Sequence, residues 1–326
     1  MRLRGIDFGH VLDASGARAF FGEGYPYHRL LRPIGLNFRG STFVAKTTTV
    51  APRVGNMPLR DDLAPRERLP RCIVVKWWKG IALNAVGLSG PGAAALLADG
   101  RWQRRSEPFF LSFMSVATTA SERHAELSGF VDLLTTHLPQ FRAPIGLQLN
   151  FSCPNVSVAN AGVIDEIRAA LDVAATLGIP LMPKLSVVMP LDVALAVAQH
   201  PSCDALCVSN TVPWGALTHR IDWKKLFGSD ISPLAEFGGG GLSGRPLLPL
   251  VFDWLMNARE AGLTVPVNAG GGVLSPLDAH MLFAAGASSI FLGSIAMLRP
   301  WRMQKTIHLA KTVGAKTEAI RVRRRE

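Results

Sequence analysis

A cysteine stands at the end of a predicted β-strand, between two asparagines. Residues 145–150 alternate apolar with small or polar side chains, as a strand does, and Pro154 prevents the strand from continuing. Cys153 is therefore presented at a strand end, with Asn150 and Asn155 beside it. A thiol can remove a proton, and each amide offers a donor and an acceptor to a flat heterocycle with C=O and N–H groups. A buried structural cysteine next to a turn is the alternative interpretation.

Eight short apolar segments alternate with helical patterns and would position these residues. The predicted strands cover residues 10–14, 41–46, 109–115, 145–150, 181–185, 205–208, 265–268 and 289–292. This alternation predicts a (β/α)8 barrel, an α/β TIM barrel, in which the chemistry lies at the carboxyl ends of the strands. An open doubly wound sheet is the alternative fold. The GxGxxG pattern at Gly239, Gly241 and Gly244 follows no predicted strand and supports that alternative only weakly.

We expect one barrel domain over residues 1–326. A long basic excursion occupies residues 52–80, with a predicted strand near 73–77, and a short basic tail follows over 299–326. Helices are predicted over residues 92–99, 131–138, 163–177, 191–199 and 246–261, and a further helix begins at Ser275-Pro276.

Composition limits the class of protein. Lys and Arg outnumber Asp and Glu by 35 to 24, so the net charge is +11, which favours anionic ligands or solvated basic faces over contact with RNA or an acidic membrane. Four cysteines without CxxC spacing, and an N-terminus without an apolar core, predict a cytoplasmic protein. The uncharged residues 281–298 contain glycines and serines that divide them into a helix end and a strand, so we expect no membrane span.

The predicted barrel would bring together polar residues that are distant in sequence. These are Lys46, Asn84, Asn150, Cys153, Asn155, Lys184, Asn210 and Thr211. Such a set can hold a neutral or anionic planar ring and move a proton, but it supplies no redox group. The sequence has no HExxH motif and no paired carboxylates, so it supports neither a metal site nor glycosidase chemistry. Gly271-Gly272 and Gly293-Ser294, after the last two strands, could bind the phosphate of a nucleotide-like cofactor through backbone N–H groups.

The stretch Asn150-Phe-Ser-Cys-Pro-Asn155 resembles the active-site motif of dihydroorotate dehydrogenases. Other stretches resemble signatures of the same family and occur in the same order. They are residues 14–16, 46–48, 52–56, 84–88, 240–246 and 270–272. The resemblance extends over residues 10–298.

The resemblance implies an FMN enzyme that oxidises dihydroorotate to orotate in pyrimidine biosynthesis. Cys153 would remove the C5 proton while hydride passes from C6 to flavin N5, and Lys184 would stabilise the charge of the reduced flavin. The pyrimidine would contact Lys46, Asn84, Asn150, Asn155, Asn210 and Thr211, with Lys46 near its carboxylate. The flavin would contact Ala14, Gly16, Lys46, Thr47, Asn150, Lys184, Ser243 and Gly244, and its phosphate would contact Gly271, Gly272, Gly293 and Ser294.

The subclass and the electron acceptor stay open at this point. A cysteine base resembles the soluble members of the family, whereas residues 240–246 look more like the membrane-associated members, and residues 156–160 replace a usual Pro-Gly turn. The resemblance implies a homodimer and is compatible with a flavin/iron–sulfur electron-transfer subunit. Fumarate, NAD through such a partner, and a quinone are the acceptors to consider.

Three other functions compete with this interpretation. A tRNA-dihydrouridine synthase is also an FMN barrel with an Asn-x-x-Cys-Pro element, but it needs a helical RNA-binding domain, for which too few residues follow Leu298. A non-catalytic barrel that binds RNA or another anionic partner predicts a damaged site. An oxidoreductase that acts on another dihydropyrimidine would keep the motif and change the loop after Asn155.

Overall fold

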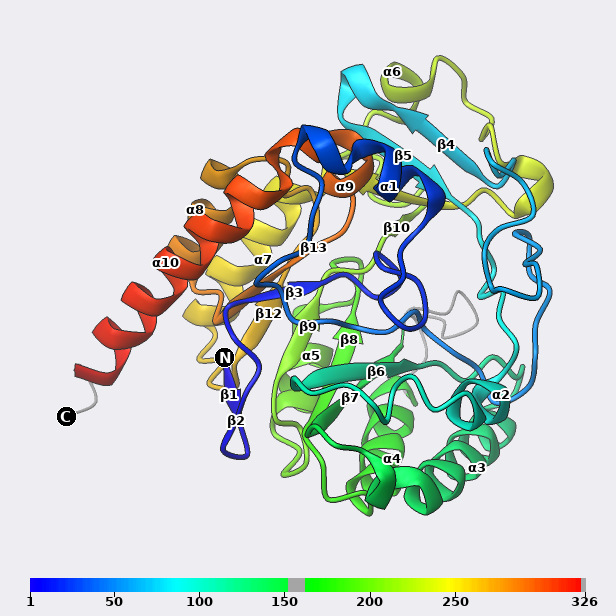
Figure 1. Cartoon of the computed structure of the whole chain (residues 1–326). Coiled ribbons are helices and arrows are strands. Elements are labelled where there is room, and N and C mark those ends of the chain that lie inside the picture. Colours follow the sequence, from blue (N-terminus) through cyan, green and yellow to red (C-terminus); the bar gives the residue numbers. More distant parts are fainter. Residues whose placement is uncertain (152–161, 324–326) are drawn as a thin grey trace.

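Seven parallel strands form a curved wall in the spatial order β3-β13-β12-β9-β8-β7-β6 (Figure 1). The computed structural model describes residues 1–151 and 162–323. The strands of the wall are β3 (Val11–Asp13), β6 (Phe109–Phe113), β7 (Ile145–Asn150), β8 (Leu181–Leu185), β9 (Leu206–Val208), β12 (Val267–Ala269) and β13 (Ser289–Leu292).

Residues 42–48 close this wall into a barrel. Thr42 N donates to Val11 O of β3 at 2.8 Å, and on the other side Phe110 N of β6 donates to Phe43 O at 3.0 Å. Parallel bridges at Thr42, Val44 and Thr48 continue the same pairing. The (β/α)8 barrel is therefore confirmed, and an open sheet is excluded. Seven of the eight predicted strands are observed, whereas residues 41–46 pair with both neighbouring strands through isolated bridges and form no continuous strand.

Alternating side chains of the wall fill two separate cores. Val44 and Phe110 belong to the cluster inside the barrel, whereas their neighbours Phe43 and Phe109 belong to the larger cluster under the helices. Strands buried on both faces are expected to be almost continuously apolar, as Phe109–Phe113 is. A Cβ at Gly146 would collide with the ring of Phe110, so the absence of a side chain there lets this phenylalanine fill the interior.

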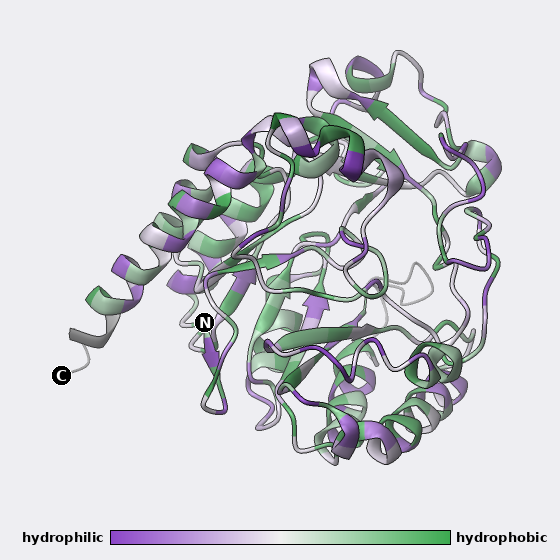
Figure 2. Ribbon diagram, viewed as in Figure 1, coloured by the Kyte–Doolittle hydropathy of each residue, from purple (hydrophilic) through white to green (hydrophobic). Residues whose placement is uncertain are grey.

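Helices cover the outside of the wall. They are α2 (Ala93–Ala98), α3 (Ala120–His137), α4 (Val163–Ala175), α5 (Leu191–Ala198), α7 (Leu247–Glu260), α8 (Pro276–Ala285), α9 (Ile295–Leu298) and α10 (Met303–Arg323). Hydrophilic residues are interspersed along these outer helices, and hydrophobic residues dominate the strands (Figure 2). Ser275 caps α8 as predicted, because its hydroxyl accepts a hydrogen bond from Asp278 N at 3.3 Å.

The C-terminal residues differ from the predicted basic tail. Residues 303–323 form the long helix α10, whose Met303, Ile307 and Ala310 are buried. These three residues follow the i, i+4, i+7 spacing of a helix face that packs on a core. Most of the predicted basic tail is thus a helix whose buried face packs on the barrel.

A small antiparallel sheet lies above the barrel, in the order β10-β11-β5-β4 (Figure 1). Its strands are β4 (Ile73–Lys76), β5 (Ile81–Asn84), β10 (Val212–Pro213) and β11 (Gly241–Gly244), so the predicted strand near 73–77 is confirmed. The glycines of the GxGxxG pattern lie in and just before β11, which pairs antiparallel with β5 and is not the parallel strand of a Rossmann unit. At the opposite end, the hairpin β1 (Arg2–Leu3) and β2 (Ile6–Asp7) adds Met1 and Leu3 to the inner core.

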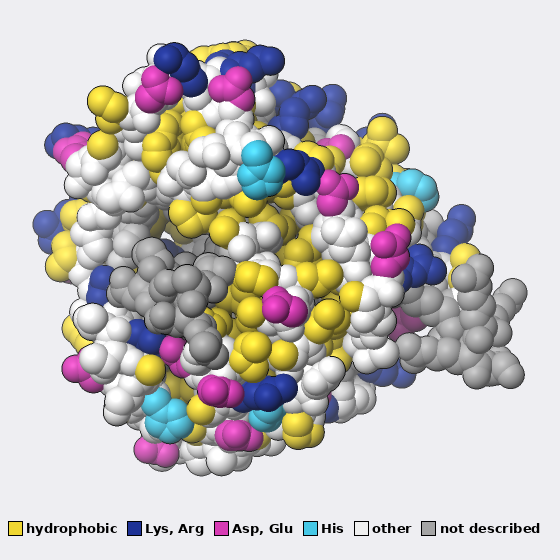
Figure 3. Space-filling view, turned by 180° about the vertical axis from the view of Figure 1, so that it is seen from behind, with side chains coloured by type: hydrophobic (Ala, Val, Ile, Leu, Met, Phe, Trp, Pro, Cys, Tyr) yellow, Lys and Arg dark blue, Asp and Glu magenta, His cyan; other side chains and the backbone are white. Residues whose placement is uncertain are grey.

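Part of the basic excursion has a structural role. Lys76 Nζ donates to Phe227 O at 3.0 Å, and Lys79 Nζ donates to Lys225 O at 2.7 Å, at the end of α6 (Trp223–Phe227). Cations at a helix C-terminus compensate its unpaired carbonyl groups. Figure 3, seen from behind, shows Lys and Arg side chains gathered along the upper rim, over this sheet and helix.

Among the helices within residues 1–151 and 162–323, none combines the length and the apolar character that crossing a membrane requires.

Candidate active site

Four predicted residues meet at the carboxyl ends of β7, β8 and β9. Asn150 is the register partner of Lys184 in the parallel pair β7–β8, and Asn210 Nδ2 donates to Asn150 Oδ1 at 3.0 Å. Thr211 N donates to Asn210 Oδ1 at 2.9 Å, which fixes the orientation of that amide. The structure therefore brings Asn150, Lys184, Asn210 and Thr211 together, as the barrel predicts.

Lys184 is a buried cation inside this end of the barrel. Its side chain is 7% exposed, and its ammonium has no hydrogen-bond or ion-pair partner among the described residues. Burial lowers the pKa of Lys184, and the nearby thiol of Cys207 opposes this shift. Holding an unpaired ammonium in the interior costs free energy unless an anionic group can approach it. The position of Lys184 thus suits a ligand that carries or develops negative charge.

Lys46 is a second buried cation at the mouth of the barrel. Its ammonium donates to the carbonyl of Ser89 and lies 4.5 Å from the centre of the Phe20 ring. No ion pair of Lys46 occurs among the described residues, and burial lowers its pKa to about 8. Lys46 can therefore receive a carboxylate, but its own charge depends on pH near neutrality.

The covering sheet brings Asn84 toward this group. Asn84 is the register partner of Gly241, and its Nδ2 donates to Gly241 O at 3.4 Å. A Cβ at Gly241 would overlap the hydroxyl of Thr211, so β11 packs directly on the end of β9. Contacts through Gly241 and Thr211 thus connect Asn84 to Asn210. Ser243, also on β11, donates to Ala82 O at 3.3 Å.

Glycines form close backbone contacts at the other side of the mouth. Gly272 has φ +77°, and a Cβ there would lie 2.7 Å from Gly244 O and 2.7 Å from Leu248 N. A Cβ at Gly293 would lie 2.7 Å from the Cβ of Ala14. The backbone N–H groups of residues 271, 272, 293 and 294 have no acceptor among the described residues. Free N–H groups on a glycine cradle are suited to a phosphate.

A chain of hydroxyl groups supports the same end of the barrel; it joins the predicted Thr47 to Ser15 and Ser112, which were not predicted as site residues. Ser15 Oγ and Thr47 Oγ1 are 2.8 Å apart, and Thr47 Oγ1 and Ser112 Oγ are 2.9 Å apart. Gln148, two residues before Asn150 on the same strand face, is the register partner of Ser112. The period-two alternation of a strand, extended back from Asn150, could have identified Gln148. Gly16 approaches this group closely, because a Cβ there would lie 3.5 Å from Lys46 Cγ.

Two predicted residues remain outside this description. Cys153 and Asn155, with the altered residues 156–160, lie outside the residues that the structure describes. No group of three or more His, Cys, Asp or Glu side chains suited to a metal ion occurs in the described part of the chain.

Comparison with known families gives one match over most of the chain. Residues 15–310 match the model of a family described as dihydroorotate dehydrogenase.

Curated relatives carry names from the same family. One is dihydroorotate dehydrogenase A (fumarate) of Lacticaseibacillus paracasei, 30% identical over 87% of this chain and 87% of the relative. Another is the catalytic subunit of dihydroorotate dehydrogenase B (NAD(+)) of Streptococcus pneumoniae, 28% identical over 92% of this chain and 86% of the relative.

A solved structure shares the fold. The crystal structure of DHODH from Eimeria tenella in complex with ferulenol superposes with a TM-score of 0.63 at 18% identity, covering 96% of this chain and 82% of that one. At this identity the likeness concerns the fold alone.

Proposed function

The chain belongs to the dihydroorotate dehydrogenase family, and from this premise we propose that FMN and dihydroorotate bind at the mouth of the barrel with Cys153 as the base. The enzyme is an oxidoreductase that converts dihydroorotate to orotate in pyrimidine biosynthesis, and enzymes of this family are flavoproteins. The family match replaces the tRNA-modifying and non-catalytic alternatives. The observation that carries the assignment of the site is the buried, unpaired Lys184 beside the Asn150–Asn210 pair.

The residues at the mouth fit FMN. The free N–H groups of Gly271, Gly272, Gly293 and Ser294 would hold its phosphate. Lys184 would lie against the edge of the isoalloxazine that becomes negatively charged, with Ala14, Gly16, Thr47, Ser243 and Gly244 along the rest of the cofactor. When bound, FMN supplies the oxidising power by accepting the two electrons of the substrate C6–H bond.

The polar side chains fit the substrate. The ring of dihydroorotate presents amide N–H and C=O groups, which the amides of Asn84, Asn150, Asn155 and Asn210 and the hydroxyl of Thr211 can pair. Lys46 would pair with the carboxylate. In its thiolate form, Cys153 would take the C5 proton, because a thiol with an ordinary pKa near 8.5 is partly ionised at neutral pH.

Gly272→Ala is expected to lower the flavin content of the purified protein about tenfold or more. The new methyl group has no room between Gly244 O and Leu248 N, so the cradle must open, and a loss of about 1.4 kcal/mol in binding is tenfold in affinity. The flavin-to-protein absorbance ratio measures this. Gly262→Ala is the matched control, because Gly262 has φ +80° and a Cβ there would have no atom within 4 Å. Equal flavin loss in both variants would assign the effect to backbone strain.

Binding of orotate is expected to weaken as pH rises through about 8. Below this value Lys46 is protonated and attracts the carboxylate, whereas above it the free protein must first take up a proton to bind the anion. The dissociation constant should therefore rise by up to about tenfold per pH unit. Flavin difference spectra recorded during titration with orotate measure it. Lys46→Met should bind weakly at all pH values without the inflection, and an inflection that persists would belong to another group.

The proposed function is tested by anaerobic mixing with dihydroorotate. Loss of the flavin band near roughly 450 nm supports the assignment, because it reports reduction of the cofactor by this substrate. A bound flavin that stays oxidised would indicate another dihydropyrimidine as the substrate.

Electron acceptor and assembly complete the proposal. We place the enzyme in the cytoplasm as a homodimer. The two relatives with fumarate and NAD(+) in their names are 30% and 28% identical, so identity does not select between these acceptors. Addition of fumarate, a quinone or NAD to the reduced enzyme separates them, and reoxidation by NAD only with a second protein would identify a flavin/iron–sulfur partner subunit.

A further inference from the structure

An arginine-rich cleft lies outside the barrel and is lined mainly by the connection between β3 and residues 42–48. Its volume is about 530 Å³, which is within the usual range for small-molecule sites. The cleft is formed by residues 18–24, by α1 (Pro26–Leu31) with the loop that follows it, and by residues 105–107. Its arginines are Arg18, Arg29, Arg32, Arg39 and Arg105. Glu23 and Glu107 are the acidic residues along its described lining, so positive charge predominates.

The barrel wall separates this cleft from the candidate active site. Arg105 lies over the rings of Phe43 at 4.2 Å and Phe109 at 5.2 Å. Both rings belong to the core on the outer side of the wall, whereas their neighbours Val44 and Phe110 face the inside. A ligand in the cleft would therefore bind on the outer side of the wall, whereas the candidate active site lies at the mouth of the barrel, inside the wall.

Two of the arginines are held in place before any ligand binds. Arg105 Nη1 donates to Phe21 O at 3.0 Å, and Arg18 Nε donates to the buried Asp13 Oδ2 at 2.5 Å. The Arg18 guanidinium lies 5.3 Å from the same Phe43 ring that Arg105 covers. Burial and, after it, the charge of Arg18 lower the pKa of Arg105, while Asp13 and Glu107 oppose this shift. A bound anion would add to this compensation of the two cations.

Two buried donors in the cleft have no acceptor. Arg105 Nε and His28 Nε2 are buried and have no hydrogen-bond partner in the described part of the chain. His28 Nδ1 accepts a hydrogen bond from Tyr25 N at 3.4 Å, so the ring proton of the neutral imidazole is on Nε2. Burial, followed by the charge of Arg18, lowers the pKa of His28 to about 4, so the ring is neutral at physiological pH. Unsatisfied buried donors next to a cleft are explained by a ligand that accepts from them.

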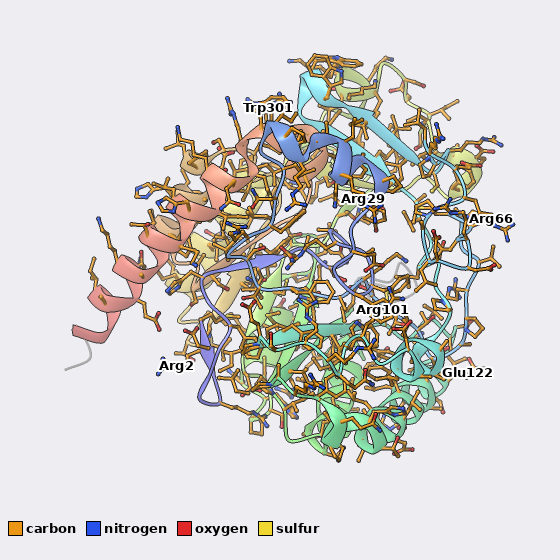
Figure 4. The ribbon with its side chains drawn as sticks, viewed as in Figure 1. Arg2, Arg29, Arg66, Arg101, Glu122 and Trp301 are labelled. Atoms are coloured by element: carbon orange, nitrogen blue, oxygen red, sulfur yellow. The ribbon has the colours of Figure 1, made fainter. Side chains whose placement is uncertain are left out.

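The exposed rim of the cleft adds three further arginines to the fixed pair Arg18 and Arg105. Arg29, Arg32 and Arg39 are exposed, and their guanidinium groups form no ion pair with any described residue. Figure 4 shows Arg29 projecting from α1, and it also labels Arg101, whose guanidinium lies 3.9 Å from the Phe21 ring of the same N-terminal loop.

We propose that this cleft binds a small anion with two or more phosphate groups, at a site distinct from the flavin and dihydroorotate sites. Guanidinium groups pair in a bidentate geometry with carboxylate and with phosphate oxygens, but each phosphate offers more acceptor oxygens and more charge, so a diphosphate can serve more of the five arginines than a single carboxylate or a chloride. Arginines on three separate segments favour a ligand with more than one charged group. Arg18 and Arg105 form the fixed base of the site, and Arg29, Arg32 and Arg39 form its exposed rim.

Isothermal titration of the flavin-containing enzyme with inorganic pyrophosphate tests this proposal. The titration is run at constant ionic strength, with and without saturating orotate. We expect one pyrophosphate per chain in both conditions and a dissociation constant that rises at least tenfold in Arg29→Gln/Arg39→Gln. Arg66→Gln/Arg68→Gln removes the same charge from the exposed excursion and should leave the constant unchanged. Glu107→Gln should tighten binding, because it removes a negative charge from the cleft.

Three results would overturn the proposal. Equal weakening in the two double variants would mean that pyrophosphate responds only to net charge. Competition between pyrophosphate and orotate would place the anion in the active site. Citrate that binds as tightly as pyrophosphate would refute the selection for phosphate.

Discussion

Replacement of Cys153 by alanine is expected to lower the turnover of dihydroorotate by a factor of about 10² to 10⁴, the usual contribution of a positioned base. The purified variant should keep its flavin, because the proposed flavin contacts, the cradle at Gly272 and Gly293 and the cation of Lys184, do not include the side chain of Cys153. Cys153→Ser should regain activity only at high pH, since a hydroxyl loses its proton far less readily than a thiol. Stopped-flow measurement of flavin reduction as a function of pH separates the two variants.

Alkylation provides an independent test of the same residue. The other cysteines, Cys72, Cys203 and Cys207, are buried, and burial raises the pKa of Cys203 and of Cys207 to about 12. They should therefore react slowly with iodoacetamide, and loss of activity should follow modification of Cys153 alone and be slowed by orotate. Cys203→Ala is the control and should be inactivated at the wild-type rate. Full activity of Cys153→Ala at neutral pH would contradict the assignment of the base. So would a Cys203→Ala variant that iodoacetamide no longer inactivates.

The sequence predicted the barrel because each strand carries its own local signal. The apolar segments at 109–115 and 145–150 are short, bounded by polar residues and separated by a helical pattern, and parallel strands then place their carboxyl ends on one face. Lys46, Asn150 and Lys184 could be grouped for this reason. In the covering sheet only β4 had such a signal, and the pairing of the sheet had none, because β5 pairs with β11, more than 150 residues later in the chain. Pairing at that separation leaves no periodicity within a short window.

The electrostatic character of the site also depends on contacts that a sequence does not reveal. Lysines are usually solvated, and nothing in residues 181–185 indicates that the ammonium of Lys184 is enclosed without a hydrogen-bond or ion-pair partner among the described residues. The same holds for the arginine cleft, where Arg18 and Arg105 both contact the Phe43 ring although they are distant in sequence. In both cases the residue type was visible in the sequence, but its surroundings were set by the closure of the barrel.

Lys184→Met is expected to slow reduction of the flavin by dihydroorotate about 10²-fold, which is typical when one preorganised charged partner is removed from a developing charge. If the same charge stabilises the fully reduced flavin to the same extent, the equilibrium constant for flavin reduction also falls about 10²-fold. For a two-electron couple this corresponds to about 60 mV, so the midpoint potential of the flavin should fall by about that amount. The reason is that Lys184 is enclosed and unpaired, so its charge acts at low dielectric on whatever negative charge arises beside it. Reduction kinetics and a redox titration measure the two effects.

Stability of the flavin-free protein distinguishes this role of Lys184 from a structural one. Burial lowers the pKa of Lys184 below its ordinary value of 10.5, so the unfolded chain binds the proton more tightly than the folded chain. The protonated lysine therefore destabilises the flavin-free fold below its folded-state pKa, and this cost disappears as pH rises through 10.5. Lys184→Met should raise the melting temperature of the flavin-free protein at pH 7, while it lowers the midpoint potential of the flavin in the flavin-containing protein.

Lys76→Gln is the control, because it removes a lysine that is bound to the carbonyls at the end of α6, and the midpoint potential of the flavin should stay unchanged in it. A Lys184→Met variant that is less stable without flavin and has an unchanged midpoint potential would make this lysine a packing residue. A cation that serves an anionic ligand lowers the free energy of unfolding until that ligand binds, whereas a packing residue stabilises the fold with or without the ligand.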